Sequence, residues 1–416
     1  MQTENNPAPA KFTSYQVLAI ILLTLTQFSV VLDFMVMSPL GDMLMKSMSL
    51  TTSQFGFAVS AYAFSAGASG LLTAGFADRF DRKKLLLFFY IGFIAGTLFC
   101  SLATTYHLLI AARILTGIFG GVIGSISMAI VADLFPLQQR GRAMGLMQMG
   151  FGASQVLGIP ISLYIANRWG WQSPFLAIVG LSTLIWLTVV IKMRPVNKHL
   201  ELKTEKKAVT HLWHTIKLRK YRVGFLLTAL LSLGGFMMMP WGSAFAVNNL
   251  HVSYAQLPLL FMVGGLVSLV VMPLVGKLSD KVDKAKIFTF AALWMMIVIV
   301  IYTNLQPIPF YLVLIMNVLV MIGIMSRIVP AMALVSALPQ MQDRGAFMSI
   351  NSSLQQIAGG VAAAISGMIV VQSTKTSPLQ HYNTLGYIIV VILVLNIFMI
   401  YRVNNIVKAQ QQLAKV

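Results

Sequence analysis

Twelve long apolar runs constrain this chain more than any other feature of its sequence. Each run approaches the ~20 residues that an α-helix needs to cross a bilayer. Only 10% of the 416 residues are charged, whereas a soluble domain carries about 25%. Because backbone polar groups must be satisfied within lipid, such runs cross it as helices. We therefore predict an all-α membrane protein with spans at roughly 16–38, 53–75, 85–104, 108–132, 143–166, 174–192, 223–247, 256–278, 287–304, 310–334, 346–371 and 385–402.

The basic residues are distributed very unevenly around these spans. Of the 30 Lys and Arg residues, all but five lie in the tails, the linker or the loops that follow even-numbered spans; the five are Lys46, Arg113, Arg168, Arg327 and Lys375. Cytoplasmic loops of membrane proteins carry such an excess of Lys and Arg. We therefore predict cytoplasmic termini. The formal net charge of +19 is then an orientation signal, which argues against a nucleic-acid partner.

The longest linker divides the spans into six and six. We predict a cytoplasmic tail (1–15), an N-terminal six-helix bundle (16–192), a cytoplasmic linker (193–222), a C-terminal six-helix bundle (223–403) and a second tail (404–416). Leu212, Trp213 and Ile216 within the basic linker favour a short amphipathic helix on the anionic leaflet. A solvated linker remains the alternative.

The loop after the second span carries a recognisable charged pattern, Ala74-Gly75-Phe76-Ala77-Asp78-Arg79-Phe80-Asp81-Arg82-Lys83-Lys84. It resembles the loop 2–3 signature of the major facilitator superfamily, except that Ala74 replaces its first Gly and Asp81 its central Gly. Gly276-Lys277-Leu278-Ser279-Asp280-Lys281 echoes it after span 8. The alternative is a positively charged loop with no other role.

The resemblance implies two pseudo-symmetric six-helix bundles that alternate around a central site. A second pair of loops supports the internal repeat, because the segment after span 4, Leu134 to Met144, is echoed after span 10 by Leu338 to Met348. In the superfamily, such loops form a cytoplasmic gate, which here would comprise Asp78, Arg79, Arg82, Asp133, Arg140, Asp280 and Arg344.

Asp33 is the one acid that falls well inside a predicted span. The chain has eleven acids, and the others lie in tails, loops or span ends. Ionisable groups inside membranes are expensive and usually functional. If a proton crosses with the substrate near the midplane, Asp33 is the candidate carrier, and Arg113 in span 4 is the natural cation beside it. A static ion pair that holds two helices together is the alternative.

Family resemblance supports a proton-coupling role for both residues. Arg113-Ile-Leu-Thr-Gly117 is similar to the Arg-x-x-x-Gly signature in span 4 of proton-coupled members, and Leu32-Asp33 to the acidic span 1 motif of drug–proton antiporters. Leu157-Gly158-Ile159-Pro160 resembles the motif of efflux members, with an extra Ile.

The remaining polar residues of the spans are candidates for binding substrate. A positive excess from Arg113 and Arg327 favours an anionic or zwitterionic solute, although Arg327 could instead snorkel or bond backbone carbonyls. Hydrogen bonds between helices explain the uncharged candidates equally well. The full set is Tyr62, Arg113, Gln148, Gln155, Trp241, Asn248, Asn317, Arg327, Asn351 and Gln355.

These features predict a proton-coupled secondary transporter, most simply an exporter of small amphipathic compounds. Uptake or flipping of an anionic or lysolipid-like solute is the alternative. The single Cys100 excludes a disulfide framework and a cysteine metal site, and we expect neither metal nor cofactor. We expect no enzymatic activity, because no cluster of acids, His or Cys is evident; a non-transporting receptor is a further alternative. We predict a monomer in a bacterial inner membrane, with protons, lipid and a small molecule as partners.

Overall fold

The fold is helical throughout the described part of the chain. A computed structural model describes residues 12–73, 79–197, 200, 208–340 and 343–413. In these ranges the one piece of β structure is an isolated bridge between Val371 and Gln380. The predicted all-α class is therefore confirmed.

The helices correspond closely to the predicted spans. The first six spans are formed by α1 (Ser14–Val36) with α2 (Gly41–Met48), α3 (Thr52–Thr73), α4 (Arg82–Leu102), α5 (Tyr106–Leu134), α6 (Leu137–Ala153) with η2 (Ser154–Gly158) and α7 (Ile159–Trp169), and α8 (Ser173–Lys192). The others are α10 (Arg219–Phe236) with η4 (Met239–Trp241) and α11 (Gly242–Asn248), α12 (Leu257–Lys281), α13 (Lys284–Thr303), α14 (Phe310–Ala337), α15 (Arg344–Ile369) and α16 (Tyr382–Leu413).

Eleven of these spans within the described residues are apolar enough to cross a membrane by length and composition. The twelfth, α15, has 26 residues but includes Asn351, Ser352, Ser353, Gln355 and Gln356. It packs extensively against α3 and α10, so much of its surface faces protein rather than lipid. A polar sequence is tolerated there because neighbouring helices cover it.

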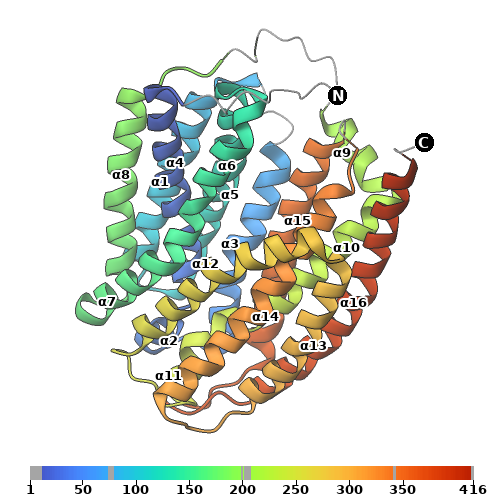
Figure 1. The fold of residues 1–416 in the computed structure, drawn as a ribbon. Helices are drawn as coiled ribbons and strands as arrows, with labels where there is room; N and C mark the ends of the chain where they lie inside the picture. The colour runs from blue at the N-terminus through green and yellow to red at the C-terminus, as the bar shows by residue number, and fades with distance from the viewer. Residues whose placement is uncertain (1–11, 74–78, 198–199, 201–207, 341–342, 414–416) are drawn as a thin grey trace.

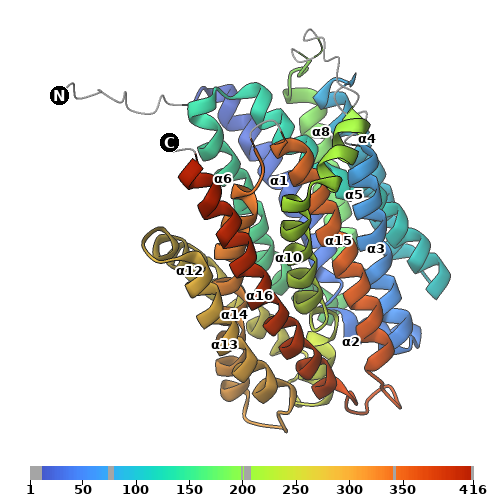
Figure 2. The same cartoon turned by 90° about the vertical axis from the view of Figure 1, so that its right-hand side faces the viewer.

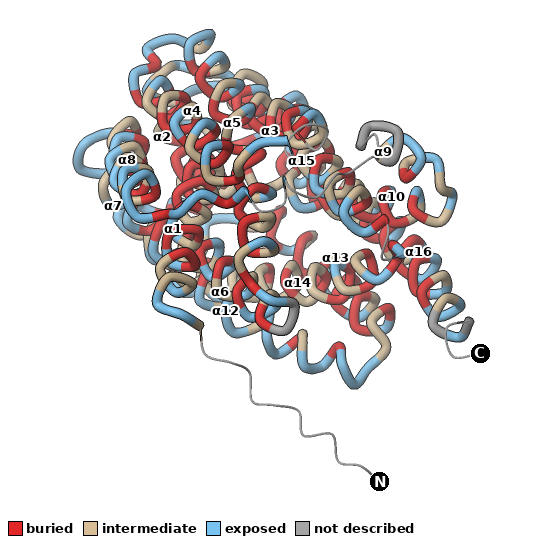
Figure 3. Tube along the Cα trace, turned by 90° about the horizontal axis from the view of Figure 1, so that it is seen from above, coloured by how far each residue is buried: buried red, intermediate tan, exposed pale blue. Residues whose placement is uncertain are grey.

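The helices form two groups that meet along α3 and α15. In Figure 1, α1, α4, α6 and α8 lie on one side and α10, α13 and α16 on the other, with α12 between them. We call α1 to α8 the first half and α10 to α16 the second half. Figure 2 shows α3 and α15 side by side, as in Figure 1. Seen along the helices in Figure 3, buried residues face neighbouring helices and exposed ones face outward. α1 begins and α16 ends at one end of the molecule, which we call the terminal end.

The contact between α3 and α15 is made by glycines. A Cβ on Gly56 would lie 2.7 Å from the Ala363 carbonyl oxygen, and one on Gly367 would lie 3.0 Å from the Thr52 carbonyl oxygen. Toward the terminal end, a Cβ on Gly67 would lie 2.9 Å from the Ser353 carbonyl oxygen. Small residues let membrane helices approach backbone to backbone. The two halves therefore touch along most of the length of these helices.

Two helices break at matching positions at the end opposite the termini. Between α1 and α2 the sequence reads Met37-Ser38-Pro39-Leu40-Gly41, and around η4 it reads Met238-Met239-Pro240-Trp241-Gly242. Proline lacks the N–H that an α-helix requires, so each break follows from its own proline. A third irregularity, the π-helical turn η2, immediately precedes Ile159-Pro160 and has the same cause.

The linker forms a short helix, α9 (Ala208–Lys217), as predicted. Its Thr215 is buried, and the helix packs against α15. Trp213 is exposed, and the Lys217 ammonium lies 5.6 Å from the centre of its ring. An apolar ring beside a cation suits a membrane interface.

Candidate functional site

Asp33 and Arg113 form a buried ion pair inside the first half. The Arg113 Nη1 donates to Asp33 Oδ2 over 3.0 Å, and neither side chain is exposed. Thr97 of α4 donates its hydroxyl to the other carboxylate oxygen, Oδ1, over 3.1 Å. The Nε and Nη2 of Arg113 are buried without a hydrogen-bond partner. The pair thus joins α1, α4 and α5, and it leaves part of the guanidinium unsatisfied.

Aromatic rings cover the side of this pair that faces the second half. The Tyr62 ring of α3 lies over the Arg113 guanidinium, 4.6 Å from its Cζ. Phe34 packs on Tyr62 with 5.1 Å between ring centres, and Phe236 of α10 packs on Phe34 at 5.9 Å. Phe236 belongs to the second half, so the two halves meet here over the ion pair.

The ion pair lies nearer to the end opposite the termini than to the terminal end. Arg113 is the eighth of the 29 residues of α5, a helix that runs toward the terminal end. At 1.5 Å per residue, it lies about 10 Å inside that helix. Asp33 precedes the break that separates α1 from α2 by four residues.

A second polar cluster joins the halves at the end opposite the termini. Asp42 of α2 is buried and pairs with Lys46 at 2.8 Å. The Asn248 side-chain amide donates to Asp42 Oδ1 over 2.5 Å, and the Tyr254 hydroxyl donates to Asp42 Oδ2. The Lys46 ammonium also donates to Asn248 Oδ1 at 3.0 Å and to Tyr254 at 3.1 Å. We call these four residues the outer cluster; sequence reasoning missed three of them.

Further hydrogen bonds extend this closed contact between the halves. Ser243 donates to the Ser38 carbonyl oxygen over 2.9 Å, and Ser38 in turn donates to the carbonyl oxygen of Met239. Thr52 donates to the Val370 carbonyl oxygen over 2.6 Å. The pKa of the Tyr254 hydroxyl is raised above that of an ordinary tyrosine. Burial is the main cause, and the hydrogen bond to the Asp42 carboxylate adds to it.

Two predicted substrate residues take part in this closed contact. Asn248 holds Asp42, as above. Trp241 is completely buried, donates its indole N–H to Ser366 Oγ over 3.0 Å and packs edge-on against Phe55 of the first half. In this structure the polar groups of both side chains bond to protein atoms. A role of either residue in binding substrate stays a prediction.

The other substrate candidates are dispersed. Gln148 is exposed on α6, and Gln155 lies in η2, where its carbonyl oxygen would be 3.0 Å from a Cβ on Gly265 of α12. Asn351 accepts a hydrogen bond from Thr228 over 2.7 Å, and Gln355 is exposed on the same helix.

Arg327 and Asn317 both lie on α14 but do not form one site. They are ten residues apart, which corresponds to about 15 Å along a helix. The Arg327 side chain is buried, and Nε donates to the Gly323 carbonyl oxygen over 3.3 Å. Asn317 Oδ1 is buried without a partner. From the sequence, a hydrogen bond from Arg327 to a backbone carbonyl was the alternative to substrate binding, and the structure contains such a bond.

The predicted gate residues are placed only in part. Asp78 lies outside the described residues, and Arg79 is exposed. The Arg82 Nε donates to Asp133 Oδ2 over 3.3 Å, which joins α4 to α5 within the first half. Asp81, the departure from the family pattern, has a structural explanation: its carboxylate caps α4 by accepting the N–H groups of Lys83 and Lys84.

The second half repeats this cap. Asp283 accepts the N–H groups at the start of α13 and pairs with Lys408 at 2.5 Å. Burial by itself would raise the pKa of Asp283, but hydrogen bonds from Lys408, Asn404 and the Ala285 N–H lower it to about 2. Of the remaining predicted residues, Arg140 donates to the Phe135 carbonyl oxygen over 2.9 Å.

Asp280 and Arg344, the last two predicted gate residues, are exposed. Beside Arg344, the unpredicted Asp343 is buried and accepts the Tyr221 hydroxyl over 2.7 Å.

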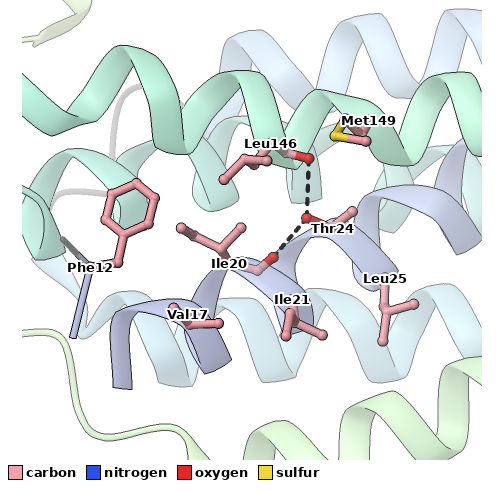
Figure 4. Close-up of a pocket in the computed structure, with 8 residues that line it drawn as sticks. All are labelled: Phe12, Val17, Ile20, Ile21, Thr24, Leu25, Leu146 and Met149. Atoms are coloured by element: carbon pink, nitrogen blue, oxygen red, sulfur yellow. Dashed lines mark hydrogen bonds between the residues drawn. The ribbon is translucent and has the colours of Figure 1, made fainter. Parts of the chain in front are cut away.

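Two apolar grooves lie apart from all these residues. One, of about 290 Å³, runs between α1 and α6 and is shown in Figure 4. In it Thr24 donates to the Ile20 carbonyl oxygen over 2.7 Å. The other, of about 330 Å³, lies between α3 and α5. Neither contains a predicted site residue, so neither is the candidate site.

Comparison with known proteins decides the family. A family model described as Major Facilitator Superfamily matches residues 23–363. The chain belongs to the major facilitator superfamily. Solved structures match the fold as well. One is a bacterial homologue of the human lysosomal transporter Spinster in an inward-facing, unoccupied conformation. It matches with a TM-score of 0.79 and 16% identity, over 96% of this chain and 99% of that one. A D-xylose–proton symporter matches with a TM-score of 0.75 and 18% identity, over 92% and 97%.

Sequence relatives within the superfamily vary in name. The MFS-type transporter YbcL of Bacillus subtilis is 24% identical over 91% of this chain and 95% of its own length. The vacuolar membrane amino acid uptake transporter fnx2 of Schizosaccharomyces pombe is 33% identical over 36% of this chain, and the match spans 26% of fnx2. A probable sugar efflux transporter of Helicobacter pylori is 29% identical over 37% of this chain and 39% of its own length.

Proposed function

We propose that this member of the major facilitator superfamily is a proton-coupled secondary transporter that exports small amphipathic compounds by alternating access. The observation that carries the proposal is the fully buried pair of Asp33 and Arg113. A charge without access to water is costly unless it is paired. Such a pair inside a transporter is a candidate for a switch.

Protonation of Asp33 would change the pair in a definite way. The neutral carboxyl no longer attracts Arg113, whose Nε and Nη2 already lack partners. The guanidinium then needs a new acceptor, because an unpartnered buried cation is unfavourable. Movement of Arg113 would shift Tyr62, which lies over it, and through Phe34 the contact with the second half.

The closed contact around the outer cluster fits one state of an alternating cycle. The two halves are hydrogen-bonded at the end opposite the termini, and we infer that the central path in this state opens at the terminal end. The basic residues gathered at that end support its assignment to the cytoplasm. We propose a monomer in a bacterial inner membrane, with 16–192 and 223–403 as its moving units and Asp78, Arg79, Arg82 and Asp133 at its cytoplasmic gate.

Transport by oriented vesicles tests the proposal. Purified protein in vesicles with an imposed proton gradient should move a fluorescent amphipathic dye such as ethidium against the proton flow. Asp33→Asn should abolish the proton-driven component while the protein stays folded. Arg168→Gln neutralises an exposed charge outside the proposed site and gate and serves as the control. Unaltered proton dependence in Asp33→Asn would remove this residue from the mechanism.

Arg327 supports a second candidate, movement of an anionic or lysolipid-like solute. Its guanidinium is buried, and no described carboxylate pairs with it. A cation in this setting favours a solute with a negative group. Carboxyfluorescein and a labelled lysophospholipid, added to the same vesicles with and without Arg327→Gln, separate this candidate from dye export by direction and by substrate.

A further inference from the structure

Aromatic rings lie between the Asp33–Arg113 pair and the second half. The carboxylate is held by Thr97 and Arg113 on the inner side of the first half. On the side of the second half, the order is Arg113, then Tyr62, then Phe34, then Phe236. Tyr62 is buried, whereas Phe34 and Phe236 are partly exposed. The two phenylalanines therefore lie at the boundary between the buried pair and the surface between the halves.

Phe236 packs against another helix of its own half. A Cβ on Gly359 of α15 would lie 3.1 Å from the Phe236 ring, so the ring lies directly on the α15 backbone. The adjacent Gly360 faces Phe64 of α3 in the first half, at 3.0 Å by the same measure. The segment of α15 that packs on the Phe236 ring therefore also contacts the first half.

We propose that Phe236 is a lid by which the second half controls the access of water to the Asp33–Arg113 pair. While the ring covers Phe34, Tyr62 stays over Arg113 and the pair stays dry. When the second half withdraws, Phe34 loses its support, and water reaches the carboxylate. Phe236 is a positioning residue: it touches neither the pair nor its proton. The lid would allow Asp33 to exchange its proton with water only when the second half has moved away. This inference rests on the proposed function.

Cys100 can report on access to this site. Cys100 is the single cysteine, it is buried, and it follows Thr97 by one turn of α4. Its sulfur lies 3.7 Å from the hydroxyl of Thr116, which is on the same helix, α5, as Arg113. Thiol reagents react with accessible thiolate. The modification rate of Cys100 therefore reports how often water and reagent enter the site.

The experiment measures that rate with methyl methanethiosulfonate on full-length protein in lipid nanodiscs, followed by intact-mass spectrometry. We expect slow modification of the native protein and at least ~10-fold faster modification of Phe236→Ala, because the open population rises. Phe225→Ala is the matched control: it lies on the same helix, but it stacks on Phe347 inside the second half, with 4.7 Å between ring centres.

Two outcomes would overturn the proposal: a native rate in Phe236→Ala, or an equal increase in Phe225→Ala. If the alanine variant fails to fold, as judged by its thermal melt, Phe236→Leu and Phe225→Leu replace the pair and decide by the same comparison. The readout does not depend on transport. Faster Cys100 modification in Phe236→Ala, together with no proton-driven dye export by the native protein, would therefore support the lid and refute the proposed function. Native dye export with no faster modification in Phe236→Ala would refute the lid alone.

Discussion

Asn248 of α11 donates a hydrogen bond of 2.5 Å to the carboxylate of Asp42 on α2, and this bond crosses from one half of the molecule to the other. Asp42 is buried, and Lys46 and Tyr254 share its second oxygen. The helices that carry Asp42 and Asn248 both follow a proline break. The contact thus closes the molecule at the end opposite the termini.

Asn248→Ala should weaken that closure. A hydrogen bond to a charged group contributes about 1.5–3 kcal/mol, so the closed population should fall roughly ten- to a hundredfold relative to the open one. Spin labels on the exposed positions Thr104 and Gln306, in a Cys100→Ser background, would measure the distance between the halves. We expect a longer distance in the variant. Arg168→Gln, a charge change within the first half, should leave it unchanged; an identical distribution in Asn248→Ala would contradict the prediction.

Removing one member of the Asp33–Arg113 pair should destabilise the protein more than removing both. Arg113→Met leaves the Asp33 carboxylate buried and unpaired, which costs about 3–5 kcal/mol. The double variant Asp33→Asn with Arg113→Met removes both charges and should be more stable than the single one. Thermal unfolding in one detergent, at one pH, measures the difference. Equal melting temperatures for the two variants would mean that the pair contributes no charge coupling.

Acid should release a local contact at the terminal end. The pKa of Asp283 is lowered to about 2, below the ~3.9 of an unperturbed aspartate. The stability it contributes is therefore present above pH ~4 and is lost as the pH falls toward 2. Asp283→Asn should flatten the dependence of melting temperature on pH in this window. Because Lys408 is largely exposed, high salt should reduce the effect, and a salt-independent curve would argue against this ion pair as its source.

Gly56 should not tolerate even a methyl group. Its Cβ would lie 2.7 Å from the Ala363 carbonyl oxygen, so Gly56→Ala must push α3 and α15 apart, at a cost of about 1–3 kcal/mol. At Gly180 of α8, nothing lies within 4 Å of a new Cβ. Gly180→Ala should be neutral or slightly stabilising, by up to about 1 kcal/mol. Comparing the two melting temperatures tests whether the glycine contact, rather than helix propensity, sets the effect.

Hydropathy and charge predicted the twelve spans because lipid imposes those two patterns directly on the sequence. They also brought Asp33 and Arg113 together, since a lone acid within a span needs a cation. The outer cluster was missed because Asp42 reads as a loop acid until α2 and α11 are placed face to face. Trp241 and Asn248 were assigned to substrate because a polar group in a span has the same sequence pattern whether it contacts a helix or a solute.

Asp81 illustrates the reverse case. Asp81 stands where the family pattern has its central Gly, and nothing in the sequence explained the difference. In the structure its carboxylate caps α4, and Asp283 caps α13 in the same way. Capping depends on a residue's position at a helix start, which a string comparison does not contain. The lid residue Phe236 had no sequence signal, because a phenylalanine in a span is ordinary.

The glycine contact between α3 and α15 bears on how cheaply the protein can change state. Where the two backbones touch directly, as at Gly56 and Gly367, no side chain lies between them that would have to be withdrawn when the helices tilt. Such a joint can turn with few rotamer changes and little exposure of new surface. Most of the energy that separates the two end states should then reside in the hydrogen bonds of the outer cluster and in the buried pair of Asp33 and Arg113, where a proton or a solute can alter it.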